Sequence, residues 1–111
     1  MEKLFLALDK LRSSSLPVIV EGPKDRDALL SFGVQNVFVL NSSVKVVEEI
    51  ASCHNICVIL TDLDREGRCL YAGLSRELRS RGIRVNDSFR HFLFKTRLRN
   101  IEGLASYVSR P

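Results

Sequence analysis

The feature that most constrains the fold is a series of short apolar runs that alternate with segments of helical periodicity. The strands that these runs predict cover residues 17–21, 37–40 and 56–60. The third run is apolar throughout, which is typical of a strand buried on both faces of a parallel sheet. Strands that alternate with helices build right-handed βαβ units. We therefore expect an α/β, Rossmann-like fold, with a mainly parallel sheet of about four strands and helices on both faces.

The remaining elements follow from hydrophobic periodicity and from helix end signals. Pro23 suits the first position of a helix, because the N–H that proline lacks would be unsatisfied there. Gly82 is expected to end the long helix that begins at Arg65. The expected helices cover residues 2–12, 23–32, 44–52, 65–80, 86–98 and 101–108, and a short fourth strand covers 83–85.

The length of 111 residues suits one domain. We expect a core over about residues 16–85, with an N-terminal helix before it and a basic, helical C-terminal part after it. No apolar run approaches the roughly 20 residues that span a bilayer, and residues 1–10 lack a signal-peptide pattern. The sequence therefore predicts a cytoplasmic protein without a membrane partner. Its three cysteines, an odd number, argue against a disulfide framework.

The charge of the chain is divided unevenly. Residues 1–64 carry 6 Lys and Arg against 9 Asp and Glu, whereas residues 65–111 carry 11 against 4. An acidic part joined to an arginine-rich part suits a metal-dependent protein that acts on a polyanion, and a solvated basic surface is the alternative. The arginines expected to follow a nucleic-acid backbone are Arg76, Arg79, Arg81, Arg84, Arg90, Arg97 and Arg99.

Acidic side chains follow two of the predicted strands. Glu21 ends the first strand, and Asp62 and Asp64 come directly after the third. Ligands bind beyond the carboxyl ends of the strands in an open α/β sheet, and these two strands would be neighbours in a doubly wound order. Glu66 adds a fourth carboxylate in the first turn of the next helix. Carboxylates held close together repel one another unless a cation separates them, so the sequence predicts a site for Mg²⁺ or Mn²⁺.

The same acidic residues also have structural explanations. Asp64 is a good N-cap for the long helix, and Asp62 suits a turn. Asp25 and Glu66 complement the dipoles of the helices that they begin. Glu21, which directly follows an apolar strand, has no such duty. The spacing of the whole group therefore favours a functional role over separate structural ones.

Two short motifs resemble those of a known family. The first has the pattern EGxxD and begins at Glu21, and the second has the pattern DxDxEG and begins at Asp62. Together they resemble the Toprim domain, the catalytic domain shared by type IA and type II topoisomerases, bacterial primases, OLD-type nucleases, recombination-repair proteins and 5S ribosomal RNA maturases. The second motif is similar to the type IA topoisomerase version. The resemblance covers about residues 16–85, and the short chain is similar to small stand-alone Toprim proteins related to the maturases.

The resemblance implies roles for the matching positions. Glu21 would be the general acid or base and would also contact metal. Asp62 and Asp64 would ligate Mg²⁺, with Glu66 as an additional ligand. Arg68 departs from the type IA pattern, which has an acidic residue there. The residues expected to contact nucleic acid are Lys24, Arg65, Arg68, Arg76 and Arg79.

Two functions fit these expectations. The first is a small metal-dependent nuclease that hydrolyses phosphodiester bonds in RNA or DNA, and the second is a non-catalytic nucleic-acid-binding module or a subunit of a larger complex. A topoisomerase would need a strand-passage gate, and a primase would need template-binding and zinc modules. A receiver-like regulatory domain is a third reading, which the lack of a clear fifth strand disfavours. The expected partner is nucleic acid, and a second copy of the chain or another protein is an additional candidate.

Overall fold

The computed structural model describes residues 2–41 and 43–109, and helices alternate with strands from α1 to β4. In chain order the elements are α1 (Glu2–Ser14), β1 (Val18–Val20), α2 (Pro23–Ser31), β2 (Val37–Val39), α3 (Ser43–Cys53), β3 (Ile56–Ile59), α4 (Arg65–Ser80), β4 (Arg84–Val85), α5 (Ser88–Phe94) and α6 (Leu104–Ser109). The helix expected over residues 65–80 has these same bounds. None of the helices in the described ranges is both long enough and apolar enough to cross a membrane.

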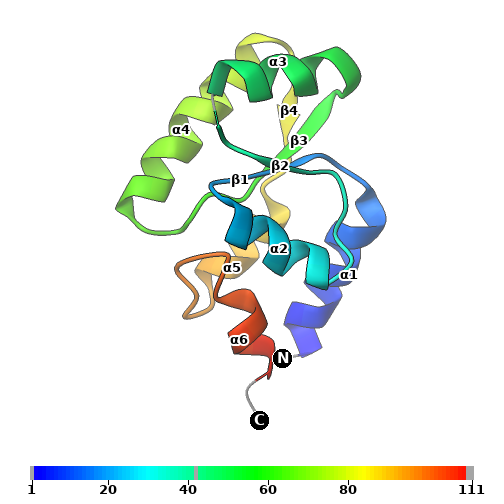
Figure 1. The fold of residues 1–111 in the computed structure, drawn as a ribbon, viewed down its shortest axis with the longest axis vertical. Helices are drawn as coiled ribbons and strands as arrows, with labels where there is room; N and C mark the ends of the chain where they lie inside the picture. Colours follow the sequence, from blue (N-terminus) through cyan, green and yellow to red (C-terminus); the bar gives the residue numbers. More distant parts are fainter. Residues whose placement is uncertain (1, 42, 110–111) are drawn as a thin grey trace.

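The four strands form an all-parallel sheet in the order β2-β1-β3-β4 (Figure 1). In β1, Ile19 lies opposite Phe38 of β2 on one side and opposite Ile59 of β3 on the other. β4 is short and pairs with the first residues of β3. Because the strands are parallel, the residues that follow β1 and β3 lie at the same edge of the sheet. The expected α/β fold with a four-stranded parallel sheet is confirmed.

Helices cover both faces of the sheet, and each face has its own core (Figure 1). On one face, Val18, Val20 and Val58 pack with residues of α1, α2, α5 and α6. On the other face, Ile19 and Ile59 pack with residues of α3 and α4. Successive side chains of β1 thus enter opposite cores, as the two-residue period of a strand requires. Full burial of one such side chain stabilises the fold by about 1.5–3 kcal/mol.

The long helix α4 leads from the carboxyl end of β3 to the start of β4. Its N-cap is Asp64, whose side chain accepts a hydrogen bond from the Gly67 N–H at 2.8 Å. Leu74 and Leu78 are buried against the sheet. Beyond the helix, Gly82 adopts a φ of +79°, which favours glycine because it has no Cβ. The expected end of the helix at this glycine is confirmed.

The C-terminal part differs from the expected helices. α5 ends at Phe94 rather than near residue 98, and α6 begins at Leu104 rather than at residue 101. The Thr96 hydroxyl donates to the Leu93 carbonyl oxygen at 2.7 Å and accepts from the Leu98 N–H at 3.1 Å. These local bonds compete with continued helix formation and explain the early end of α5.

Candidate functional site

Glu21 and Asp62 meet at the carboxyl edge of the sheet. Glu21 follows β1, Asp62 follows β3, and these two strands are neighbours. The Glu21 Oε2 atom accepts a hydrogen bond from the backbone N–H of Asp62 at 2.6 Å. The expectation that the first and third strands lie side by side is confirmed. The strand order thereby joins two positions that are 41 residues apart in the sequence.

The other carboxylates at this edge are also held by backbone N–H groups. Asp62 Oδ1 accepts from the Ile101 N–H at 3.2 Å, and Asp64 Oδ1 accepts from the Gly67 N–H at 2.8 Å. The N-cap role expected for Asp64 is therefore confirmed. Glu21, Asp62 and Asp64 each retain a second carboxylate oxygen that accepts no hydrogen bond from the described residues.

Burial and, after it, neighbouring negative charges raise the pKa values of Glu21 and Asp62 at the sheet edge. Burial raises the pKa of Glu21 above its ordinary value, and the charges of Asp62, Asp64 and Asp25 add to the shift. Burial also raises the pKa of Asp62, with contributions from Asp64 and Glu102. Backbone N–H groups oppose both shifts without cancelling them. A bound cation would offset the cost of holding these charges together in a partly desolvated place.

Asp25 joins this group from the first turn of α2. It is 8% exposed, and its carboxylate accepts a hydrogen bond from the Gly22 N–H at 3.1 Å. Burial and then the charge of Asp62 raise its pKa. Asp25 lies in the first turn of α2, the position from which it was expected to complement the helix dipole, and its charge also raises the pKa of Glu21.

The donor chemistry of the site suits a hard divalent cation. Carboxylate oxygens are the ligands that Mg²⁺ prefers, and Glu21, Asp62 and Asp64 each have one that accepts no hydrogen bond within the described chain. Across residues 2–41 and 43–109, no three His, Cys, Asp or Glu side chains converge closely enough to hold a metal ion as they stand. Binding of a cation by three of these side chains at once would therefore require them to turn toward one another, whereas one or two carboxylates with water suffice for Mg²⁺.

The other predicted site residues lie on the surface of the protein. Lys24 and Glu66 are exposed in the first turns of α2 and α4, and Arg65 is the exposed first residue of α4. The structure thus brings Glu21, Asp62 and Asp64 together, while Glu66 makes no hydrogen bond or ion pair with them within the described chain. The arginines farther along α4 are also exposed, and they are Arg68, Arg76 and Arg79.

Arg90 has a role that the sequence did not indicate. It is 3% exposed, so its expected place along a nucleic-acid backbone is wrong. Its guanidinium donates to the carbonyl oxygens of Thr61 at 2.7 Å and Asp62 at 3.2 Å. It also lies 4.6 Å from the centre of the Tyr71 ring, and burial lowers its pKa. Arg90 therefore holds in place the segment that carries Asp62.

Two further contacts fix the segment that follows β3. A Cβ atom at Gly67 would overlap with the backbone of Asp62, so only glycine allows the first turn of α4 to lie this close. The Leu63 N–H donates to the Arg99 carbonyl oxygen at 2.7 Å. The non-helical stretch between α5 and α6 thus helps to build the site, although nothing in its sequence pattern indicated this.

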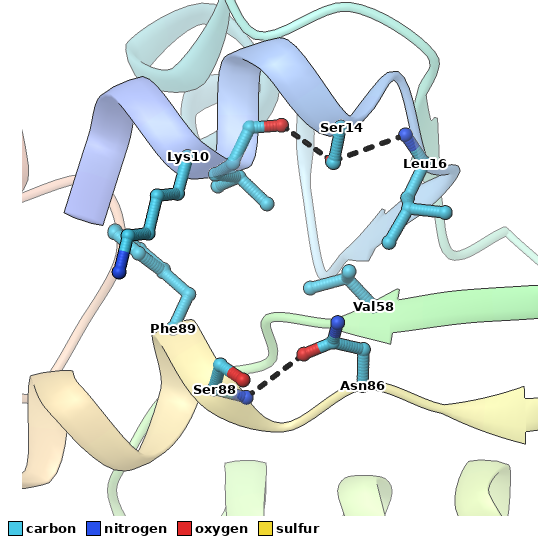
Figure 2. Close-up of a pocket in the computed structure, with 8 residues that line it drawn as sticks. Lys10, Ser14, Leu16, Val58, Asn86, Ser88 and Phe89 are labelled. Carbon is cyan, nitrogen blue, oxygen red and sulfur yellow. Dashed lines mark hydrogen bonds between the residues drawn. The ribbon is translucent and has the colours of Figure 1, made fainter. Parts of the chain in front are cut away.

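A separate cavity of about 180 Å³ lies between α1 and α5 (Figure 2). Lys10 of α1 and Phe89 of α5 line it together with Val58 of β3. Near its rim the Ser88 N–H donates to the Asn86 side chain at 3.0 Å. The residues that line it, all from the described chain, include no carboxylate. The cavity is therefore not part of the acidic site.

Fold and site together define a parallel α/β protein with a group of carboxylates at the carboxyl edge of its sheet. The chain belongs to the UPF0292 family. A UPF0292 protein of Methanocaldococcus jannaschii is 34% identical over an alignment of 118 positions, which covers 98% of this chain and 92% of that protein. A UPF0292 protein of Pyrococcus abyssi is 36% identical over 105 residues, which cover 92% and 80%. A solved structure of an Aquifex aeolicus protein has a TM-score of 0.84 and 29% identity, and the match covers 88% of this chain and 94% of that one. No protein-family model matches the chain.

Proposed function

We propose that the protein is a Toprim-type enzyme that uses Mg²⁺ or Mn²⁺ to hydrolyse phosphodiester bonds in RNA or DNA. The observation that carries this proposal is the contact between Glu21 and Asp62 across neighbouring strands, where burial and nearby negative charges raise the pKa values of both residues. Groups with raised pKa values that gather at a ligand-binding edge are functional candidates.

The residues at this edge would divide the chemistry between them. Asp62 and Asp64 would hold the cation, which would stabilise the negative charge that develops on the phosphate. Glu21 suits proton transfer, because burial and nearby charges move its pKa upward, toward the pH at which a general acid or base works best. Lys24 and Arg65, which are exposed in the first turns of α2 and α4, would contact the phosphate.

The test is cleavage of labelled RNA and DNA in Mg²⁺, Mn²⁺ or EDTA, with Glu21→Gln and Asp62→Asn beside the unaltered protein. We expect metal-dependent cleavage that both substitutions abolish. Glu48→Gln is the matched control, since Glu48 is an exposed glutamate of α3, remote from the carboxylate group in the sequence and on a different element. Cleavage that persists in Glu21→Gln would remove Glu21 from the mechanism.

The second candidate is a nucleic-acid-binding module that carries no chemistry of its own or acts only with a partner. The observation that favours it is that one oxygen each of Glu21, Asp62 and Asp64 is already held by a backbone N–H, as in ordinary caps and turns. This candidate predicts binding of RNA or DNA without cleavage in any metal. Binding that Glu21→Gln leaves unchanged, with no cleavage to lose, would establish it over the nuclease.

A further inference from the structure

Four arginines of α4 form a single stripe along its exposed side. They are Arg65, Arg68, Arg76 and Arg79, and all four are exposed. Since an α-helix turns by about 100° per residue, these positions fall within a sector of about 80°. Glu66 and Glu77, the acidic residues of α4, lie about 100–120° from Arg65, outside that sector. The helix therefore separates its positive and negative side chains onto different sides.

Carboxylates border the stripe on both flanks, so the stripe is one arginine wide. Glu66 and Glu77 lie on one flank. On the other, Asp87 accepts a hydrogen bond from the Tyr71 hydroxyl at 2.7 Å and lies 3.9 Å from Arg79. Even so, the Arg79 side chain is 57% exposed. Within the described chain, Arg65, Arg68 and Arg76 make no ion pair.

A hollow of about 450 Å³ lies along the C-terminal half of the stripe. Ala72 lies in the same sector as the arginines, and its short side chain leaves the space open. Arg76 and Arg79 line the hollow together with Tyr71 and Ser75. Two guanidinium groups beside an aromatic ring suit a nucleotide, which offers both a phosphate and a base.

The stripe starts at the carboxylates and leads away from them. Arg65 follows Asp64, the N-cap of α4, and Arg79 lies 14 residues further on. At a rise of about 1.5 Å per residue, the stripe is about 21 Å long. A stacked strand rises about 3.4 Å per nucleotide. The stripe therefore spans about six nucleotides.

We propose that this stripe is a track along which a single strand of RNA or DNA reaches the carboxylates. A duplex carries two rows of phosphates. If one row contacted the arginines, the other would lie near the carboxylates on one flank of the stripe and would be repelled by them. A single strand needs only one row of cations and leaves its bases free to enter the hollow. The role of the carboxylates at the end of the track rests on the proposed function, whereas binding along α4 does not.

The experiment measures binding of labelled 12-nucleotide RNA and DNA by fluorescence anisotropy at several salt concentrations, in EDTA so that cleavage plays no part. The variant is Arg68→Gln/Arg76→Gln, which removes two charges from the stripe and no described ion pair. Its control is Lys10→Gln/Lys45→Gln, which removes two exposed charges from α1 and α3. The slope of log K against log salt should fall by about 0.7 for each arginine removed and stay unchanged in the control.

Several outcomes would overturn the track. They are the absence of binding, an equal loss of slope in both double variants, and a duplex of the same length bound as tightly as the single strand. Tighter binding of polyglutamate than of either oligonucleotide would instead assign the stripe to an acidic protein. The affinities of the two labelled oligonucleotides show whether the track prefers RNA or DNA. A loss of slope in Arg68→Gln/Arg76→Gln alone, together with no cleavage in any metal, would disprove the nuclease and support the track. Cleavage that Arg68→Gln/Arg76→Gln leaves unchanged would support the nuclease and disprove the track.

Discussion

At the scale of single residues, the site depends on contacts between residues that are far apart in the chain. The guanidinium of Arg90 reaches back 29 residues to Thr61 and 28 residues to Asp62. The Ile101 N–H reaches 39 residues back to the Asp62 carboxylate. The segment after β3 is therefore positioned by the C-terminal part of the protein, and single substitutions there should change the site from a distance.

Replacing Arg90 by lysine should destabilise the fold although the charge is kept. A lysine ammonium is a point charge and cannot reproduce the planar fork that reaches two carbonyl oxygens. With a hydrogen bond from a charged group worth about 1.5–3 kcal/mol, we expect Arg90→Lys to lower the free energy of unfolding by about 1–3 kcal/mol. Urea unfolding measures it. Arg84→Lys, at an exposed position of β4, is the control and should change stability by less than about 0.5 kcal/mol. Equal effects at both positions would contradict the positioning role of Arg90.

Two glycines of α4 should respond to alanine in opposite ways. At Gly67 a Cβ would overlap with the backbone of Asp62, so Gly67→Ala must push the helix away from the site, at a cost of about 1–3 kcal/mol or more. At Gly73 a Cβ would meet no atom within 4 Å, so Gly73→Ala should stabilise the helix by about 1 kcal/mol. Thermal unfolding of both variants checks this. A Gly67→Ala protein as stable as the unaltered one would show that the close approach is not needed.

The sequence pattern indicates the carboxylates of the site but not the residues that hold them. Glu21 and Asp62 could be predicted because Glu21 directly follows one apolar strand and Asp62 lies just past another, and parallel strands end at one edge. Arg90 resembled the exposed arginines around it, since nothing in its neighbours shows that α5 turns it toward the core. Its burial is a property of tertiary packing, since the carbonyl groups that Arg90 contacts lie 28 and 29 residues away in the sequence.

At the scale of elements, the N-terminus of α4 combines a structural role with the proposed metal-binding role. Asp64 caps the helix through one carboxylate oxygen and leaves the other without a described partner. The N-cap role of Asp64 and its proposed role as a metal ligand are therefore compatible, because one oxygen suffices for the cap. A substitution that keeps the cap and removes the charge separates them.

Asp64→Asn should keep the helix and lose the response to metal. Asparagine caps a helix about as well as aspartate, whereas Asp64→Ala should cost about 1 kcal/mol of stability. We expect excess Mg²⁺ to raise the melting temperature of the unaltered protein, because a ligand that binds only the folded state stabilises it. In Asp64→Asn this rise should be reduced or absent while the melting temperature in EDTA stays nearly unchanged. A full Mg²⁺ response in Asp64→Asn would exclude Asp64 as a ligand.

The element boundaries show where periodicity is informative and where it is not. α4 was predicted with its observed bounds because a capping aspartate, an apolar stripe and a terminal glycine all agree. α5 was predicted too long because Leu98 follows Phe94 at a helical spacing of four residues, and this spacing gives no sign that the Thr96 side chain replaces the helical bonds. The stretch between α5 and α6 that this break creates contributes Arg99 and Ile101 to the site.

At the scale of the whole molecule, the uneven charge of the sequence is brought to one region of the surface. The carboxylates of the N-terminal part lie where α4 begins, and α4 carries the first arginines of the C-terminal part. Folding therefore concentrates negative charge at the sheet edge and positive charge beside it. Holding carboxylates together opposes folding, and this opposition should be visible in the dependence of stability on pH.

Glu21→Gln should make the protein relatively more stable as the pH rises. The folded state raises the pKa of Glu21 above its ordinary value of 4.5, mainly through burial. The folded state therefore binds the Glu21 proton more tightly than the unfolded state does, and the stability that this proton gives is lost as the pH rises through the folded pKa. Glutamine keeps an oxygen for the Asp62 N–H and never ionises. Urea unfolding in EDTA, from pH 4 to pH 7, should show a stability difference that grows in favour of Glu21→Gln.

The control for this pH dependence is Glu48→Gln, because Glu48 is an exposed glutamate of α3 with no ion pair within the described chain. Its stability difference from the unaltered protein should stay constant over the same pH range. Mg²⁺ should then reduce the advantage of Glu21→Gln near pH 7, since a cation among the carboxylates removes the repulsion that glutamine avoids. A difference for Glu21→Gln that stays constant from pH 4 to pH 7 would mean that folding does not perturb this carboxyl group. Glu21 would then have no raised pKa to suit it to proton transfer.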